Sequence, residues 1–397
     1  MGLKQFTSRL KQRYLDERLL PKMARRQLDL DRAGLPLHDA GPAAVAAANI
    51  EWIKRSQDCS LFRDGGSARD FSLLRGWASS YPETAGYIVP TLLAYAERTQ
   101  DPALEGRARH MLDWLVSIQF PEGGFQGGKI DAVPRVPVTF NTGQILLGLA
   151  AGVHHFGDPY RAPLQRAAAW LRDSLDADGC WRKFATPFAA PGEKAYETHV
   201  AWGLFEAARE EPNKGYAEAW LRQGRWALTQ QIGNGWFASN CLSSPHEPLT
   251  HTIGYALRGV IEAYRFSHEP EFLAAAQRTA DALLSVMAAD GKICGQYDRY
   301  WNAAVDWVCL TGSVQIAACW FLLHSITHES RYLNAARLAN RYVRRTVYLT
   351  GDPDLIGGVR GAFPVDGDYG RFEYLNWAAK FSIDAQLMEL DSAQGVA

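Results

Sequence analysis

Glycine-rich turns recur along this sequence at intervals of about 56 residues, and that repeat constrains the fold more than any other feature. The turns are RDGG at 63–66, EGGFQGG at 122–128, DADGCW at 176–181, GNGW at 233–236, ADGKICG at 289–295 and IGGVRG at 356–361. With Gly65, Gly123, Gly179, Gly235, Gly291 and Gly358 as markers, the intervals are 58, 56, 56, 56 and 67 residues. Such a period accommodates two helices of four to five turns with their connections.

Two kinds of helical segment flank each turn. The segment before it is amphipathic and rich in Ala, Leu and Arg, at 42–57, 102–119, 160–175, 214–231, 270–288 and 330–348. The segment after it is apolar on nearly all sides, at 82–98, 139–155, 196–210, 249–266, 307–325 and 372–390. A helix that is apolar all round is buried, whereas an amphipathic helix has one face in solvent. The sequence therefore predicts an all-α fold, an (α/α)6 toroid of six helical hairpins with an inner and an outer ring.

The repeat also predicts the domain organisation. Residues 42–390 form one toroid domain, residues 1–41 a basic N-terminal arm and residues 391–397 a C-terminal tail. Strand-like alternation is scarce and is limited to short pieces such as AVPRVPV at 132–138.

A tryptophan motif within the repeats resembles that of a known superfamily. Trp114-Leu115-x-x-x-Gln119-x-x-x-Gly123-x-Phe125 fits the W-L-x-x-x-Q-x-x-x-G-x-W repeat of triterpene cyclases. Looser copies contain Trp52, Trp170 and Trp226. The chain thus resembles the terpenoid cyclases and protein prenyltransferases over about residues 42–390, and this resemblance implies the toroid architecture. It implies much less about chemistry, because one fold hosts many reactions. The three tryptophans Trp114, Trp170 and Trp226 are expected to be structural, each wedged between an outer helix and a neighbouring turn.

The starts of the inner helices can be aligned with one another. A Thr recurs there at 84, 142, 198, 252 and 311, and the sixth copy has Asn376. All the inner helices run in the same direction, so these starts meet at one mouth of the ring. The Thr hydroxyl is expected to cap the helix or to bond a carbonyl one turn back.

The residue before this Thr carries the functional prediction. In four successive repeats it is Glu83, Asn141, Glu197 and His251, and the last two copies have Leu. These types can transfer protons near neutral pH when burial and neighbours shift their pKa values. We expect the four to converge on one cavity and to include the catalytic acid and base. The alternative is that they are hydrogen-bonded core residues.

Further residues are candidates for substrate binding. Tyr87 and Tyr255 lie one turn further along the helices that carry Glu83 and His251. His199 follows Glu197 by two residues, so their side chains diverge by about 200°. The remaining candidates come from a loop after the fifth turn and from the start of the sixth inner helix: Arg299, Tyr300, Trp301, Glu373 and Tyr374.

The sequence lacks the catalytic motifs of the superfamily that it resembles. The sequence has no D-x-D-D motif for protonating an isoprenoid. Protein prenyltransferases hold zinc with an Asp, a Cys two residues later and a His further on. Here Asp306 and Cys309 are three residues apart, and no His follows His328. Because a zinc site needs three protein ligands, we expect no metal and no cofactor.

A mouth with carboxylates, imidazole, amide, Tyr and Arg suits a sugar. Two carboxylates can serve as acid and base in glycoside hydrolysis, and a base with Asn, Arg and Tyr suits proton abstraction beside a uronate carboxylate. We expect a carbohydrate-active enzyme that performs hydrolysis, elimination or epimerisation on a uronate-containing oligosaccharide or polysaccharide. SYPETAGYIVPTLL at 80–93 and VCLTGSVQIAACW at 308–320 resemble toroid proteins of bacterial surface-polysaccharide gene clusters. The alternatives are a non-catalytic glycan-binding or scaffold toroid and an enzyme of isoprenoid chemistry.

Charge and hydropathy indicate the setting. The chain is 47% hydrophobic with a net charge of −1, which gives no electrostatic case for nucleic acid. No stretch approaches the ~18 apolar residues of a membrane span, and the N-terminus lacks the apolar region of a secretory signal. Six cysteines without a C-x-x-C pair are typical of reduced thiols, so we expect a cytoplasmic protein. Leu3, Phe6, Leu10 and Tyr14 recur at helical spacing in the basic arm. The arm is expected either to contact a membrane surface or a partner protein, or to pack against the ring.

Overall fold

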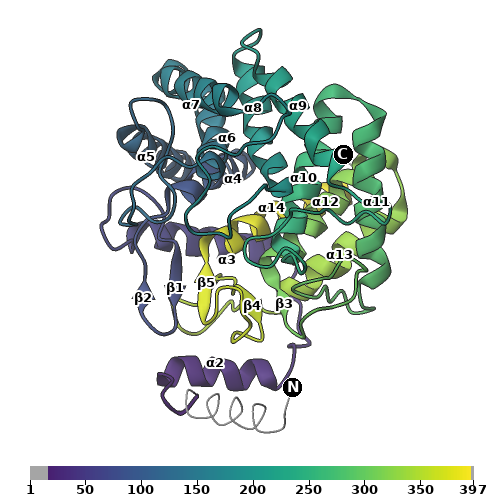
Figure 1. Ribbon diagram of the computed structural model, residues 1–397. Helices are drawn as coiled ribbons and strands as arrows, with labels where there is room; N and C mark the ends of the chain where they lie inside the picture. Colours follow the sequence, from purple (N-terminus) through teal and green to yellow (C-terminus); the bar gives the residue numbers. More distant parts are fainter. Residues whose placement is uncertain (1–16, 395–397) are drawn as a thin grey trace.

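The computed structural model of the chain describes residues 17–394 and consists mainly of two concentric rings of helices (Figure 1). The inner helices are α4 (Pro82–Thr99), α6 (Thr139–Phe156), α8 (Thr198–Glu210), α10 (Thr250–Ser267), α12 (Leu310–Thr327) and α14 (Asn376–Gln394). The outer helices are α3 (Pro42–Asp58), α5 (Pro102–Ile118), α7 (Arg161–Ser174), α9 (Tyr216–Thr229), α11 (Pro270–Val286) and α13 (Ser330–Arg344). The predicted (α/α)6 toroid is confirmed, and the last helix continues past residue 390.

Each inner helix packs on the next one, and α14 meets α4 to complete the circle. Outer helices pack mainly on the inner helix that precedes them in the chain, as α5 does on α4. The first outer helix, α3, has no such predecessor and packs on α14, the last helix of the chain. The two ends of the ring domain are therefore held together side by side.

The turn motif joins each repeat to the following outer helix. Gly123 has a φ of +110°, and a Cβ there would overlap the backbone carbonyl of Arg166 in α7. The same close approach recurs at Gly179, Gly235 and Gly291. In the sixth turn the equivalent residue is Gly357, whose Cβ would overlap the carbonyl of Ala48 in α3, so the marker Gly358 was one residue too late.

The motif tryptophans cover the same turns. Trp114 is 6% exposed and lies against Gly66. Trp170 lies against Gly124, and Trp226 clusters with Cys180. Each tryptophan thus comes from one outer helix and packs on the turn of the preceding repeat, which agrees with the structural role predicted for Trp114, Trp170 and Trp226.

Short strands add a second link between the chain ends. The strands β1 (Asp70–Ser72), β2 (Gly76–Trp77) and β5 (Glu373–Leu375) form an antiparallel sheet in the order β2-β1-β5. The strands β3 (Val308–Cys309) and β4 (Ala362–Phe363) pair separately. The alternating piece at 132–138 supplies one isolated bridge, between Gln126 and Pro137.

The arm's helix α2 (Lys22–Arg32) lies against the ring beside β3 and β4 (Figure 1). Asp31 forms an ion pair of 2.7 Å with Arg360 of the sixth repeat, and both side chains are 2% exposed. Gln27 bonds the hydroxyls of Tyr348 and Tyr374. This part of the arm packs on the ring, whereas Leu3, Phe6, Leu10 and Tyr14 lie outside the described residues.

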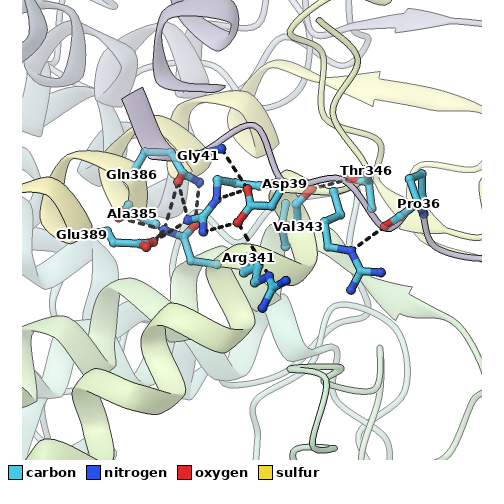
Figure 2. A network of polar contacts seen from close by, with 12 residues as sticks. Pro36, Asp39, Gly41, Arg341, Val343, Thr346, Ala385, Gln386 and Glu389 are labelled. Carbon is cyan, nitrogen blue, oxygen red and sulfur yellow. Dashed lines mark hydrogen bonds and ion pairs between the residues drawn. The ribbon is translucent and has the colours of Figure 1, made fainter. Parts of the chain in front are cut away.

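A polar network secures the segment that links α2 to the ring (Figure 2). The guanidinium of Arg344 donates to Asp39 at 2.8 Å and to Glu389 at 2.5 Å. Burial alone would raise the pKa of Asp39, but the hydrogen bonds from Arg344 and Gly41 lower it. The linker, α13 and α14 are thereby joined in one contact.

One described helix, α12, has the length and mean hydropathy of a membrane span, contrary to the expectation that no stretch approaches that length. In the structure 72% of this stretch is buried inside the ring, which is how a central helix of the toroid obtains such a composition.

Candidate active site

A cavity of about 750 Å³ opens at the mouth where the inner helices begin. Glu83 of α4, Asn141 of α6 and His251 of α10 line it. Its walls are largely aromatic, from Trp77, Tyr81, Phe140, Tyr196, Tyr369 and Trp377. A concave, mostly apolar pocket with a few converging polar groups is typical of a small-molecule site.

Glu83 stands in the first turn of α4 and is 7% exposed. The amide nitrogen of Asn141 donates to its Oε2 at 3.0 Å. Burial raises the pKa of Glu83 to about 7, although a hydrogen bond from Tyr81 and the positive charge of Arg69 act in the opposite direction. Near neutral pH this carboxyl group can therefore both hold and release a proton.

His251 is the basic counterpart of Glu83. Its Nδ1 lies 2.8 Å from Oε1 of Gln315, so Nδ1 carries the proton and donates it to the amide oxygen. Burial lowers the pKa of His251 to about 4, against the opposing effect of the Gln315 bond. The rings of Tyr255 and Tyr369 lie 4.3 and 5.3 Å away, centroid to centroid. Among the described residues Nε2 of His251 makes no hydrogen bond, so the neutral imidazole can accept a proton there.

Two arginines that the sequence reasoning missed line the same cavity. Arg69 bonds Asp70 at 2.6 Å and Glu373 at 2.9 Å, and its guanidinium lies 5.1 Å from the centre of the Trp377 ring. Arg75 bonds Glu373 at 2.6 Å, and its side chain is 70% exposed. Glu373 therefore does not line the cavity itself but holds the two arginines that do.

Glu197 does not join the other three aligned residues in this cavity. It lies in a short 3-10 turn, Ala195–Glu197, before α8 begins, whereas Glu83, Asn141 and His251 lie inside their helices. The carboxyl group lines a smaller adjoining cavity of about 290 Å³, which shares Phe140 and Tyr196 with the first. Burial raises its pKa to about 8, opposed by Lys194, and within residues 17–394 its Oε2 has no hydrogen-bond partner.

Of the three candidate residues further along the inner helices, two line the large cavity and one does not. Tyr87 and Tyr255 line the large cavity as expected. His199 is 1% exposed and lies behind it, with Nδ1 2.8 Å from Oε1 of Gln144 and its ring 4.4 Å from that of Tyr255. His199 supports the cavity wall rather than lining it.

The loop containing residues 299–301 is not at this cavity. Trp301 donates its indole N–H to the carbonyl of Asn234 at 3.0 Å, and the carbonyl of Arg299 accepts from the Asn234 side chain at 2.8 Å. Tyr300 is 71% exposed. The loop packs on the fourth glycine-rich turn because Asn234 fixes it there. Tyr374 is also away from the cavity, fully buried with its hydroxyl bonded to Gln27.

The recurrent Thr residues are mostly structural. Thr84, Thr142 and Thr252 donate to backbone carbonyls three or four residues back. Asn376 replaces Thr in the sixth copy and bonds Thr84 across the closure of the ring.

Aromatic residues next to the aligned positions were also missed. Tyr81, Phe140 and Tyr196 precede Glu83, Asn141 and Glu197 by one or two residues, and all three line the large cavity. Their recurrence was visible in the aligned helix starts. Among residues 17–394 no cluster of three His, Cys, Asp or Glu side chains could hold a metal ion.

Comparisons with known proteins agree on the fold. No protein-family model matches the chain, and the search of curated proteins found no match. Among solved structures, an unsaturated glucuronyl hydrolase specific for heparin superposes with a TM-score of 0.70 at 16% identity, covering 89% of this chain and 97% of the other.

Two further structures are sugar enzymes of other classes. A cellobiose 2-epimerase from Bacillus thermoamylovorans has a TM-score of 0.67 at 11% identity, covering 87% of this chain and 98% of its own. A D-mannose isomerase has a TM-score of 0.70 at 10% identity, covering 89% and 100%. The chain therefore shares the toroid fold of carbohydrate enzymes, and none of these three neighbours is a terpenoid cyclase.

Proposed function

We propose that this chain is a carbohydrate-active enzyme that transfers protons on a saccharide bound in the 750 Å³ cavity, with Glu83 as the acid and His251 as the base. The observation that carries the proposal is the pair of opposite pKa shifts, to about 7 for Glu83 and to about 4 for His251, in one aromatic-lined cavity. Structural neighbours named as a hydrolase, an epimerase and an isomerase of sugars support this class of substrate.

The side chains in the cavity favour proton transfer at carbon over hydrolysis by two carboxylates. Hydrolysis of that kind needs a second carboxylate facing the first. Glu197 lines the adjoining cavity, and Asp70, which does line the large cavity, is engaged by Arg69 at 2.6 Å. Epimerisation or elimination instead requires one base to remove a C–H proton and one acid to return a proton to carbon or to the leaving oxygen. Nε2 of His251 and the carboxyl group of Glu83 have these two roles in our proposal.

The arginines indicate a uronate. Removal of a proton beside a carboxylate is easier when a cation neutralises the negative charge that develops there. Arg75 is largely exposed at the cavity wall, and Arg69 lies beside it on the shared carboxylate of Glu373. Trp77 and Trp377 offer flat faces for a sugar ring.

The biological setting is part of the proposal. We propose a role in bacterial surface-polysaccharide metabolism, which the segments at 80–93 and 308–320 support. We also propose that the protein acts in the cytoplasm and that its basic arm contacts the inner membrane or a protein. The second candidate function is a glycan-binding scaffold, in which the same cavity would bind a glycan without catalysing a reaction. Isoprenoid chemistry has the tryptophan motif in its favour and lacks the D-x-D-D motif.

Proton exchange in heavy water tests the reaction directly. The protein is incubated in D₂O with a panel of uronate-containing oligosaccharides, and proton NMR follows the C–H signal beside the carboxylate. We expect deuterium to replace that proton, or a double bond to form, and Glu83→Gln or His251→Asn to slow this by about 10²–10⁴-fold. Tyr300→Ala, at an exposed residue away from the cavity, is the control.

Three outcomes decide between the candidates. Glycosidic cleavage without deuterium at carbon would replace our proposal with hydrolysis. Binding without any reaction would favour the scaffold. Full exchange in both cavity variants would contradict the assignment of Glu83 and His251.

A further inference from the structure

A second cavity of about 760 Å³ lies further along the inner helices, at the opposite mouth. It is lined by later residues of the same helices, among them Thr91, Leu147, Trp202, Arg258 and Asp384. Tyr87 lines both cavities, so a thin layer of side chains separates them. Nothing in the proposed reaction uses this second cavity.

Two buried cations lie at the inner end of this cavity. Lys380 is only 4% exposed and bonds Asp384 at 2.6 Å. Arg258 is 14% exposed, bonds Glu262 through Nε at 2.7 Å, and stacks 4.3 Å from the centre of the Trp202 ring. Within residues 17–394 neither head group makes another hydrogen bond. The Lys380 ammonium also lies 4.4 Å from the ring centre of Phe381 and 5.3 Å from that of Tyr87. Its remaining N–H donors and the two terminal nitrogens of Arg258 have no hydrogen-bond acceptor among the described residues and are available to a ligand.

The charges at this end are not balanced. Glu262 is shared by Arg258 and Arg265, and Asp384 accepts from Lys380 and from Thr91. Of these groups Arg258, Lys380 and Asp384 line the cavity, so two cations and one carboxylate face it at this end. The positive charge also affects the neighbouring His199. Burial is the largest cause that lowers the pKa of His199, and the charges of Arg258 and Lys380 are the next largest.

The outer rim is neutral by comparison. Arg98 pairs with Asp391 at 2.5 Å, Arg209 lies 3.9 Å from Glu206, and His154 lies 3.2 Å from Glu210. Between rim and floor the wall is apolar, with Pro90, Leu147, Ala150, Leu387 and Met388. A ligand would therefore place its anionic group at the floor and an uncharged part against the wall.

We infer that this second cavity binds a small organic oxyanion, with its phosphate or carboxylate group between Arg258 and Lys380. The planar guanidinium offers two parallel donors, and the ammonium adds a point charge, a combination that suits a tetrahedral or planar oxyanion. The free donors, the excess positive charge and the open cavity of about 760 Å³ all belong to residues outside the proposed active site. The inference is thus independent of the proposed function.

Calorimetric titration of the whole protein tests the site, with inorganic phosphate, glucose 6-phosphate and acetate as separate probes. Stronger binding of the two phosphates identifies a phosphate ligand, and stronger binding of acetate identifies a carboxylate. Lys380→Gln should weaken the preferred probe by about 10- to 100-fold, the effect of losing a hydrogen bond to a charged group. Arg75→Gln in the first cavity should leave the affinity unchanged.

A variant of opposite sign protects the test against misfolding. Asp384→Asn keeps the side-chain shape but removes the carboxylate that competes for Lys380, so it should strengthen binding several-fold, which a loss of folding cannot do. The proposal is overturned if none of the probes binds. It is equally overturned if Lys380→Gln and Asp384→Asn both leave the affinity unchanged, or if Arg75→Gln alone abolishes binding.

Discussion

Burial shifts the pKa values of Glu83 and His251 in opposite directions, because a low-dielectric environment disfavours the charged form of either group. The pKa of the acid rises to about 7 and that of the imidazole falls to about 4. Between these values Glu83 holds its proton and His251 is neutral. This is the protonation state in which one group can donate and the other can accept.

The rate should therefore depend on pH at both values. We expect kcat/KM on a saccharide substrate to fall below about pH 4, where His251 becomes protonated, and above about pH 7, where Glu83 loses its proton. A pH profile measures both limbs. Because Glu197 has a pKa of about 8, Glu197→Gln is the control and should leave the upper limb in place. A profile whose upper limb disappears in that variant would assign the acid to Glu197.

Glu197 also has a consequence for stability. Its folded pKa is raised from 4.5 to about 8, so the folded state is favoured by the protonated form and loses that stability as pH rises through about 8. Glu197→Gln should match the wild type in free energy of unfolding at pH 4 and exceed it at pH 9 by roughly 3–5 kcal/mol. Urea denaturation at the two pH values checks this. A variant less stable than the wild type at pH 9 would show that neighbouring groups offset the cost of burying the charged carboxylate of Glu197.

Alignment of the helix starts was sufficient to predict that Glu83, Asn141 and His251 share one cavity, because equivalent positions of a closed ring meet at one mouth. It misplaced Glu197 because the turn before α8 is a separate 3-10 segment, which an alignment of letters does not reveal. The arginines escaped notice because Arg69 and Arg75 do not lie on a helix but directly precede the short strands β1 and β2, which carry no periodic signal. The loop at 299–301 was misplaced because a long-range bond to Asn234 decides its position.

At the scale of the elements, one motif is used around the ring. A turn glycine allows the next outer helix to approach, and a tryptophan of that helix covers the turn. Gln119 adds a bridge, donating both to the turn at Gly123 and to the carbonyl of Pro163. The helices were predictable within a few residues from periodicity, but their pairing was not. The strands were not predictable because two or three residues carry no periodic signal.

Trp52 tests this motif where the ring closes. It comes from α3, is fully buried, and lies against Gly358 of the sixth turn. Trp52→Ala should lower the free energy of unfolding by about 3–5 kcal/mol, as expected for a buried aromatic residue. The matched control, Tyr300→Ala at 71% exposure, should change it by less than about 0.5 kcal/mol. Equal effects of the two variants in urea denaturation would contradict the role of Trp52 in covering the sixth turn.

At the scale of the whole molecule, the chain ends are joined in three places. The helix α3 packs on α14, β1 pairs with β5, and α2 contacts the sixth repeat through Asp31 and Arg360. The last contact was not predictable, since residues 329 positions apart give no local signal of pairing.

The buried pair of Asp31 and Arg360 gives a prediction of its own. Asp31→Leu leaves the Arg360 charge buried without its partner and should destabilise the fold by about 3–5 kcal/mol. The double variant Asp31→Leu with Arg360→Met removes both charges and should recover a substantial part of that loss. Thermal and urea unfolding of the two single variants, Asp31→Leu and Arg360→Met, and of the double variant decide the matter. A double variant as unstable as the sum of its single changes would show that the pair is not coupled.

The most direct test of the central claim is the crystal structure of the Glu83→Gln variant soaked with a uronate-containing disaccharide. The substitution keeps the shape of the side chain and removes the proton transfer, so substrate should remain intact in the crystal. We predict that the disaccharide occupies the cavity of about 750 Å³, with the carbon beside the carboxylate near Nε2 of His251 and the carboxylate on Arg75. A disaccharide bound elsewhere on the molecule, or an empty cavity at saturating ligand, would contradict the account.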